Sequence, residues 1–286
     1  MKKKSRVKTV LIIAGIVILA AFILVRLELK RSAESLTVNT YEYETGKIDQ
    51  TVKVVIIGDL HNHDFGYRLA EMIKEQAPDL ILMAGDMIDH EKKDEYMVCT
   101  LIDELKDTAP VIYALGNHEL NCMKQFPDYL SHVTKAGAVV LDREYNDIQI
   151  RGNTVRIGAM YDYPFGMSNN NAETAPQEIQ DFLKDFCSTE NMKLFIAHRP
   201  DSFVFGNVSK VYDIDIVISS HLHGGQVVVP FKGGLYGGDQ GWFPEYVHGM
   251  YEKDKIHLLI TSGLGSSSQK LPRFLNPPEI MVLELK

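Results

Sequence analysis

The feature that most constrains this chain is a run of 17 residues without a charged side chain near the N-terminus, TVLIIAGIVILAAFILV, at residues 9–25. A helix needs about 17–25 predominantly apolar residues to cross the hydrocarbon core of a bilayer. Five basic residues precede this run in MKKKSRVK, and such a flank predicts that this end stays in the cytoplasm. We therefore interpret residues 1–8 as a basic cytoplasmic tail and residues 9–25 as a transmembrane signal anchor.

We expect the rest of the chain to lie outside the cytoplasmic membrane, which makes this a single-pass protein of the cell membrane. A cleaved signal peptide is the alternative, but no small-residue cleavage site directly follows the apolar run. Residues 26–50 are polar, mixed in charge and aperiodic, which is typical of a juxtamembrane linker. The folded domain is predicted over residues 51–286.

Charge limits the partners that this domain can bind. Residues 37–286 hold 22 basic and 36 acidic side chains, which gives a formal charge of −14. Such a surface would repel nucleic acid, whose binding proteins normally present a basic face. The three cysteines show no CxxC spacing, so a zinc knuckle is not indicated.

Short apolar runs alternate with amphipathic segments over the first half of the domain. Strands are expected at 52–59, 79–86 and 110–117, with helices at 67–76 and 94–107 between them. Strands separated by helices of this length predict parallel βαβ units. This alternation of strands and helices then ends. A hairpin is expected at 146–160, and further strands are expected at 193–198 and 215–221.

The expected strands end in side chains of the types that commonly bind metals in proteins. These residues are Asp59, His61, Asp86, Asn117, His118, His198, His221 and His223. Ligands of open α/β sheets gather beyond the carboxyl ends of the strands, so we expect these side chains to converge. In an extended segment, His221 and His223 would point to the same side. Two hydrogen-bonded loop histidines are the alternative for this HxH motif taken alone.

Histidine and carboxylate ligands without cysteine suit Mn, Fe or Zn in a reactive site better than a structural zinc site. Asp59 and His61 can present a carboxylate and an imidazole to one ion, and the two oxygens of Asp86 can bridge a pair of ions. Two metals about 3.5–4 Å apart support an in-line phosphoryl displacement. The residues therefore point to phosphoester hydrolysis with two divalent metal ions.

The motifs GDLH, GDMID, GNHE, AH and SHLHGG, in this order, closely resemble those of the calcineurin-like metallophosphoesterases. The tail GLGSSSQKLPRFLNPPEIMVLELK further resembles the membrane-anchored bacterial branch of that family. The resemblance covers residues 52–286. It implies an α+β fold, a four-layer αββα sandwich of two mixed β-sheets with helices outside, which the N-terminal transmembrane helix would precede.

The resemblance also implies roles for the residues at the strand ends. One metal would be held by Asp59, His61, Asp86 and His223. The other would be held by Asp86, Asn117, His198 and His221. The catalytic residue would be His118, which would contact the phosphoester and assist its leaving group while a hydroxide that bridges the metals attacks phosphorus. The family usually has glycine where this chain has Ser220, and this departure predicts a slight shift around His221.

Five further residues lie within or beside the motifs. We interpret Asp89 and Glu119 as residues that orient the site rather than bind metal. His63 is interpreted as a solvated loop residue. Arg199 is either a phosphate clamp or a surface charge, and His90 shows no motif and is expected to be structural or exposed.

The predicted function is hydrolysis of a phosphodiester, phosphomonoester or pyrophosphate outside the membrane. Because the anchor holds the site near lipid, the expected partner is a lipid- or wall-linked phosphoester, such as a glycolipid pyrophosphate of the UDP-diacylglucosamine type. The glycine-rich segment 231–246 is either a substrate lid, with Trp242 and Phe243 as an apolar wall, or an ordered connecting loop. A catalytically silent metal-binding or cell-wall interaction module and a nuclease are the alternative functions.

Overall fold

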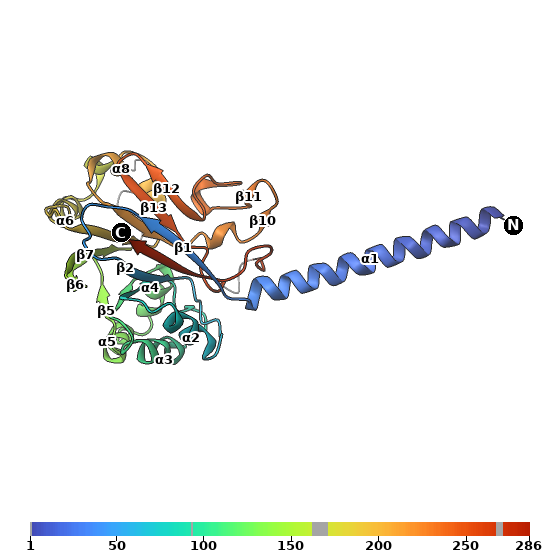
Figure 1. The fold of residues 1–286 in the computed structure, drawn as a ribbon, viewed down its shortest axis with the longest axis horizontal. Helices are drawn as coiled ribbons and strands as arrows, with labels where there is room; N and C mark the ends of the chain where they lie inside the picture. The colour runs from blue at the N-terminus through green and yellow to red at the C-terminus, as the bar shows by residue number, and fades with distance from the viewer. Residues whose placement is uncertain (1, 93, 162–170, 267–270) are drawn as a thin grey trace.

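A computed structural model describes residues 2–92, 94–161, 171–266 and 271–286, with side chains from residue 8 onwards. Met1 and the side chains of residues 2–7 lie outside this description, so the basic tail is known from the sequence alone. One long helix, α1 (Lys2–Glu34), runs outward from a domain that the rest of the chain forms (Figure 1). Its part Lys8–Glu34 is long and apolar enough to cross a membrane.

The interpretation of residues 26–50 as a linker is wrong for much of that segment. Helix α1 continues to Glu34, and the strand β1 (Thr37–Tyr43) pairs in parallel with β14 (Glu279–Leu285). Because β1 is an edge strand with polar and half-exposed side chains, it lacks the apolar run by which buried strands are detected. The domain therefore begins with β1 rather than near Thr51.

Two six-stranded mixed sheets form the centre of the domain. The first has the order β1, β14, β2 (Val52–Ile57), β3 (Leu80–Ala84), β4 (Val111–Ala114) and β5 (Val139–Leu141). The second has the order β12 (Gly249–Lys253), β13 (Ile256–Ile260), β9 (Ile216–Ser219), β8 (Met192–Ala197), β7 (Asn153–Met160) and β6 (Glu144–Ile150). Strands β2 to β5 run parallel to one another, as the βαβ pattern predicts, and β6 with β7 forms the predicted hairpin.

Helices cover the outer face of each sheet (Figure 1). The first sheet is covered by α2 (Arg68–Glu75), α3 (Glu95–Leu105), α4 (Asn117–Met123) and α5 (Tyr129–Ala136). The second sheet is covered by α6 (Gln177–Phe186), α7 (Asp201–Val204) and α8 (Val208–Val211). Shorter elements are η1 (Ala172–Thr174), η2 (His223–Gly225), η3 (Gly238–Gln240), β10 (Val228–Val229) and β11 (Gly233–Gly234).

The alternation of side chains along each strand explains the layers. In β2, Val54 and Ile56 pack between the two sheets, whereas Val55 and Ile57 pack under the helices of the first sheet. Strand β8 divides in the same way between the central core and the core under α6. Strands that are buried on both faces read as continuous apolar runs. The predicted four-layer αββα sandwich is confirmed.

Candidate metal centre

The side chains expected to converge do so at one edge of the sandwich. The carboxyl ends of β2, β3 and β4 from the first sheet meet those of β8 and β9 from the second, because both sheets place these ends on the same side. Of the eight residues predicted for this site, six are buried and two, Asn117 and His221, are half-buried. Buried carboxylates and imidazoles are costly unless they are paired or bind metal.

Tight turns, and not extended segments, position most of these residues. The backbones of Asp59, His61, Asp86, His221 and His223 have φ values between 48° and 65°. This left-handed region costs a residue other than glycine roughly 1–3 kcal/mol, and such residues cluster at functional sites. The extended geometry predicted for His221 and His223 is therefore wrong. Because the chain turns between them, the two rings lie in different clusters.

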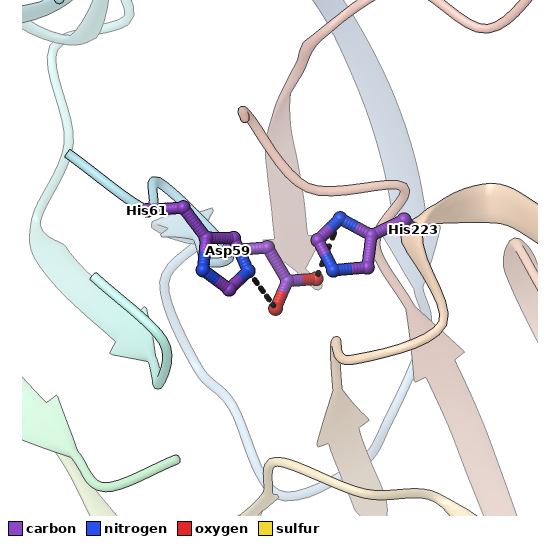
Figure 2. A group of neighbouring side chains, drawn as sticks. All are labelled: Asp59, His61 and His223. Carbon is purple, nitrogen blue, oxygen red and sulfur yellow. Dashed lines mark ion pairs between the residues drawn. The ribbon is translucent and has the colours of Figure 1, made fainter. Parts of the chain in front are cut away.

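The first cluster consists of Asp59, His61 and His223, whose ligand atoms lie within 4.8 Å of one another. The carboxylate of Asp59 lies between the two rings (Figure 2). Its Oδ1 is 3.9 Å from Nε2 of His61, and its Oδ2 is 4.0 Å from Nδ1 of His223. The two rings are nearly parallel, with centroids 5.0 Å apart.

The second cluster consists of Asp86, His198 and His221, again within 4.8 Å. Oδ2 of Asp86 lies 3.2 Å from Nε2 of His198 and 3.9 Å from Nε2 of His61 in the first cluster. The carboxylate of Asp86, which belongs to the second cluster, therefore also faces the first. This is the position required of a carboxylate that bridges two ions.

Hydrogen bonds to backbone carbonyl groups orient two of the imidazoles. Nδ1 of His198 donates to the carbonyl oxygen of Ala84 at 2.9 Å, and Nδ1 of His223 donates to that of Gly265 at 3.2 Å. A metal-binding histidine usually makes such a bond with one nitrogen and binds with the other. The atoms that could bind metal in both clusters are imidazole nitrogens and carboxylate oxygens, which suit divalent transition metals. The residues therefore fit two metal ions.

Asp86 and His198 form a strongly interacting pair. Burial acts to raise the pKa of Asp86, but the charge and hydrogen bond of His198 outweigh it and hold the pKa well below its usual range. Burial acts to lower the pKa of His198, but Asp86 raises it to about 9. In the metal-free chain, a proton on His198 thus compensates the buried carboxylate, and a bound cation would replace that proton.

Asn117 and His118 begin α4 beside this pair. The backbone N–H of His118 donates to Oδ1 of Asp86 at 2.8 Å, and Nε2 of its ring lies 4.0 Å from Oδ2 of the same carboxylate. Burial lowers the pKa of His118, while Asp86 acts in the opposite direction. Arg199 donates from Nη2 to Oδ1 of Asn117 at 3.4 Å, which places Arg199 at the site.

His90 is a site residue that the sequence analysis missed. Its backbone N–H donates to Nδ1 of His118 at 3.3 Å, and its own Nδ1 lies 2.9 Å from the same atom. Oδ1 of Asp89 lies 3.6 Å from Nδ1 of His118, which agrees with a role in orienting the site. The only sequence signal for His90 is its place directly after Asp89 in the GDMID motif. His63 lies outside the clusters and packs against Phe65.

Glu119 orients the loops, as the sequence analysis expected. Its buried carboxylate accepts hydrogen bonds from the backbone N–H groups of Asp86 and Gly116, both at 2.8 Å. It also accepts one from the hydroxyl of Tyr113 at 2.7 Å. A single side chain thus fixes the turn that carries Asp86 to the turn that precedes α4.

Ser220 produces no strain where the family usually has glycine. Its backbone does not adopt a positive φ, so the conformational freedom of glycine is not needed there. The buried hydroxyl donates to the carbonyl oxygen of Ala84 at 3.0 Å and lies 3.0 Å from Nδ1 of His198. The serine therefore adds a contact to the second cluster.

A sandwich of two mixed sheets that brings two His–carboxylate clusters together at one edge defines the class of dinuclear metallophosphoesterases. Residues 52–225 match the family described as calcineurin-like phosphoesterase. The chain belongs to this family, which confirms the resemblance seen in its motifs. Membership implies an enzyme that hydrolyses phosphoesters with two divalent metal ions.

Proteins similar to this chain are named as a metallophosphoesterase, a phosphodiesterase and a dimetal phosphatase. An uncharacterized metallophosphoesterase of Campylobacter jejuni is 27% identical over 283 residues, which cover 95% of this chain and 69% of that protein. The phosphodiesterase YaeI of Escherichia coli is 26% identical over 241 residues, which cover 82% of each chain. The crystal structure of a dimetal phosphatase from Danio rerio is 12% identical, with a TM-score of 0.47 and coverage of 77% and 89%.

Proposed function

We propose that this chain hydrolyses phosphoesters with two divalent ions, Mn, Fe or Zn, that share the carboxylate of Asp86. The first ion would be held by Asp59, His61, Asp86 and His223. The second ion would be held by Asp86, Asn117, His198 and His221. The observation that carries the proposal is the meeting of two clusters at Asp86, a member of the second cluster that also lies 3.9 Å from His61 of the first. Within each cluster the ligand atoms lie within 4.8 Å of one another.

Divalent ions bound there supply charge that stabilises the developing negative phosphoryl oxygens, and they lower the pKa of water so that hydroxide is available near neutral pH. The protein positions the proton for the leaving group. Because the N–H of His90 donates to Nδ1 of His118, a neutral ring carries its proton on Nε2. That atom lies on the side of Asp86, so the cationic form of His118 can donate its Nε2 proton to the leaving oxygen and become the neutral ring.

Arg199 is assigned to the substrate phosphoryl group rather than to the bulk surface. Its guanidinium is half-buried and bonded to Asn117, a proposed ligand. A guanidinium in this position can donate two parallel hydrogen bonds to phosphoryl oxygens. A phosphodiester is the first substrate class to test, because the similar protein YaeI is named a phosphodiesterase.

The proposed substrate is a lipid-linked phosphoester, such as a glycolipid pyrophosphate of the UDP-diacylglucosamine type. Helix α1 is long and apolar enough to hold the domain at a membrane. The basic residues before the apolar run favour a cytoplasmic N-terminus and a domain on the outer side. A domain with a formal charge of −14 disfavours nucleic acid as the substrate.

The test uses the purified full-length chain with Mn²⁺ and a panel of nitrophenyl phosphodiesters, alkyl phosphodiesters, phosphomonoesters and lipid pyrophosphates. His198→Ala is expected to lose one metal ion and nearly all hydrolysis. His132→Ala is the matched control, because His132 lies on α5 and contacts Glu95 rather than either cluster. Hydrolysis by His198→Ala at the rate of the unsubstituted chain would contradict the proposal.

A further inference from the structure

The end of α1 is attached to the domain by hydrogen bonds close to the membrane. The carboxylate of Glu28 accepts from the backbone N–H of Leu275 at 3.2 Å, and the buried hydroxyl of Ser32 accepts from that of Asn276 at 3.2 Å. Glu28 and Ser32 lie three and seven residues beyond Val25, the end of the charge-free run. At a rise of 1.5 Å per residue, these contacts lie about 5 and 11 Å along the helix axis from the end of that run.

The same contact leads directly to the metal centre. The side-chain amide of Asn276 donates from Nδ2 to the carbonyl oxygen of His223 at 2.7 Å. Arg273, which is also buried, donates to the carbonyl oxygens of Asn276 and Gly265, and Gly265 in turn orients the ring of His223. The first cluster is thus connected to the membrane helix through one residue, which keeps the site near the bilayer.

An apolar pocket opens beside the second cluster. It has a volume of about 650 Å³ and is lined by His221 together with apolar side chains that include Leu222, Tyr236, Trp242 and Leu271. Trp242 and Leu271 are 69% and 65% exposed. The hairpin β10–β11 beside this pocket lies on the side of the domain from which α1 extends (Figure 1).

The turn between β10 and β11 and the residue after Trp242 carry further exposed groups of the same kind. Phe231 is fully exposed and Phe243 partly so, and the ammonium of Lys232 lies 5.1 Å from the centre of the Phe243 ring. Tryptophan and tyrosine are enriched at membrane–water interfaces, where the ring meets apolar chains and its polar edge meets headgroups. A lysine beside such rings can reach lipid phosphates with its long side chain.

We propose that the pocket rim, formed by Phe231, Tyr236, Trp242, Phe243 and Leu271, rests in the headgroup region of the bilayer that α1 crosses. The partner is the lipid surface itself. The contacts of α1 with Leu275 and Asn276 hold the segment next to Leu271 close to the end of the apolar run. The rim would therefore reach the lipid without movement of the domain. The pocket beside His221 then opens toward the bilayer, and an apolar tail could enter it from the lipid. This inference does not require the proposed hydrolysis.

The single tryptophan of the chain makes the proposal directly measurable. The full-length protein is placed in phosphatidylcholine–phosphatidylglycerol nanodiscs, with acyl chains either unmodified or brominated near the headgroup end. Interfacial side chains lie about 5–10 Å into the headgroup and acyl boundary, within reach of the bromine. Fluorescence of Trp242 is expected to fall by about half or more in the brominated discs. Emission that is equal in the two kinds of disc overturns the proposal, and it would favour a wall polymer or protein as the partner.

A matched control moves the fluorophore away from the membrane. Trp242→Phe combined with Phe126→Trp places the single tryptophan in the segment that joins α4 to α5, at a position that is also exposed. Helix α5 lies on the side of the domain away from α1 (Figure 1). This variant is expected to show no quenching. Equal quenching of both proteins would also overturn the proposal, because contact with lipid would then not be specific to the rim. Neither result depends on hydrolysis, so the proposed function fails or stands separately.

Discussion

Replacement of Glu119 by glutamine tests how far one buried carboxylate organises the metal centre. Oε2 of Glu119 accepts two backbone hydrogen bonds, from Asp86 and Gly116. Oε1 accepts two further backbone bonds, from Met87 and Ile88 at 2.8 and 3.3 Å, and one from the hydroxyl of Tyr113. In Glu119→Gln, the NH₂ group must occupy one of these two positions, and in either orientation it faces two N–H donors.

The expected loss in the free energy of unfolding follows from the number of N–H donors left without an acceptor. A buried donor left without a partner costs about 1–3 kcal/mol, so two of them cost about 2–6 kcal/mol. Domains are commonly stable by only about 5–15 kcal/mol, so the loss is large. Because the turn that carries Asp86 would shift, we also expect a lower content of bound Mn²⁺.

Urea unfolding of the detergent-solubilised chain, followed by Trp242 fluorescence, measures the loss, and elemental analysis measures the metal. Glu71→Gln is the matched control, since Glu71 is exposed on α2, and we expect no measurable change in that variant. If Glu119→Gln unfolds at the same urea concentration as Glu71→Gln and keeps its metal, Glu119 does not organise the site as we describe.

Three further predictions concern the same site. His118→Ala should retain both metals and slow turnover by roughly 10²–10⁴-fold, with a smaller defect for nitrophenyl than for alkyl esters; a lost metal or an equal defect on both esters would refute the proton-donor role. Because Asp86 outweighs burial and raises the pKa of His198 from 6.5 to about 9, the protonated ring stabilises the metal-free chain fully below pH 6.5 and less as pH rises through 9. The unfolding midpoint without metal should fall over that window while Mn²⁺ affinity rises, and a flat profile of both would refute this. Ser220→Gly should lose about 1 kcal/mol with the hydroxyl bond to Ala84, measured by urea unfolding, and unchanged metal content would confirm that glycine is not required there.

The central strands and the approximate place of the site follow from local patterns. Strands such as β2 and β8 are buried on both faces, so their sequences are continuous apolar runs that end at the site. The predicted helices at 67–76 and 94–107 are present as α2 and α3, with boundaries shifted by one or two residues. These elements are short-range features, and short-range patterns detect them.

Other features depend on contacts between distant residues. The strand β1 was missed because its stability comes from β14, about 240 positions later, and not from an apolar pattern of its own. The roles of His90 and Arg273 come from how loops meet in space, which spacing along the chain does not show. The extended geometry expected of His221 and His223 failed because the chain takes a left-handed turn there, and no glycine at those positions signals the turn.

The number of Mn²⁺ ions bound per chain, measured together with phosphodiester hydrolysis, tests the dinuclear centre directly. We expect about two ions per chain, loss of hydrolysis after exhaustive chelation, and recovery when Mn²⁺ is restored. In Asp86→Asn the shared carboxylate is absent, so binding at both clusters should weaken and hydrolysis should be lost. Hydrolysis that survives complete removal of metal, or two tightly held ions in fully active Asp86→Asn, would contradict the account.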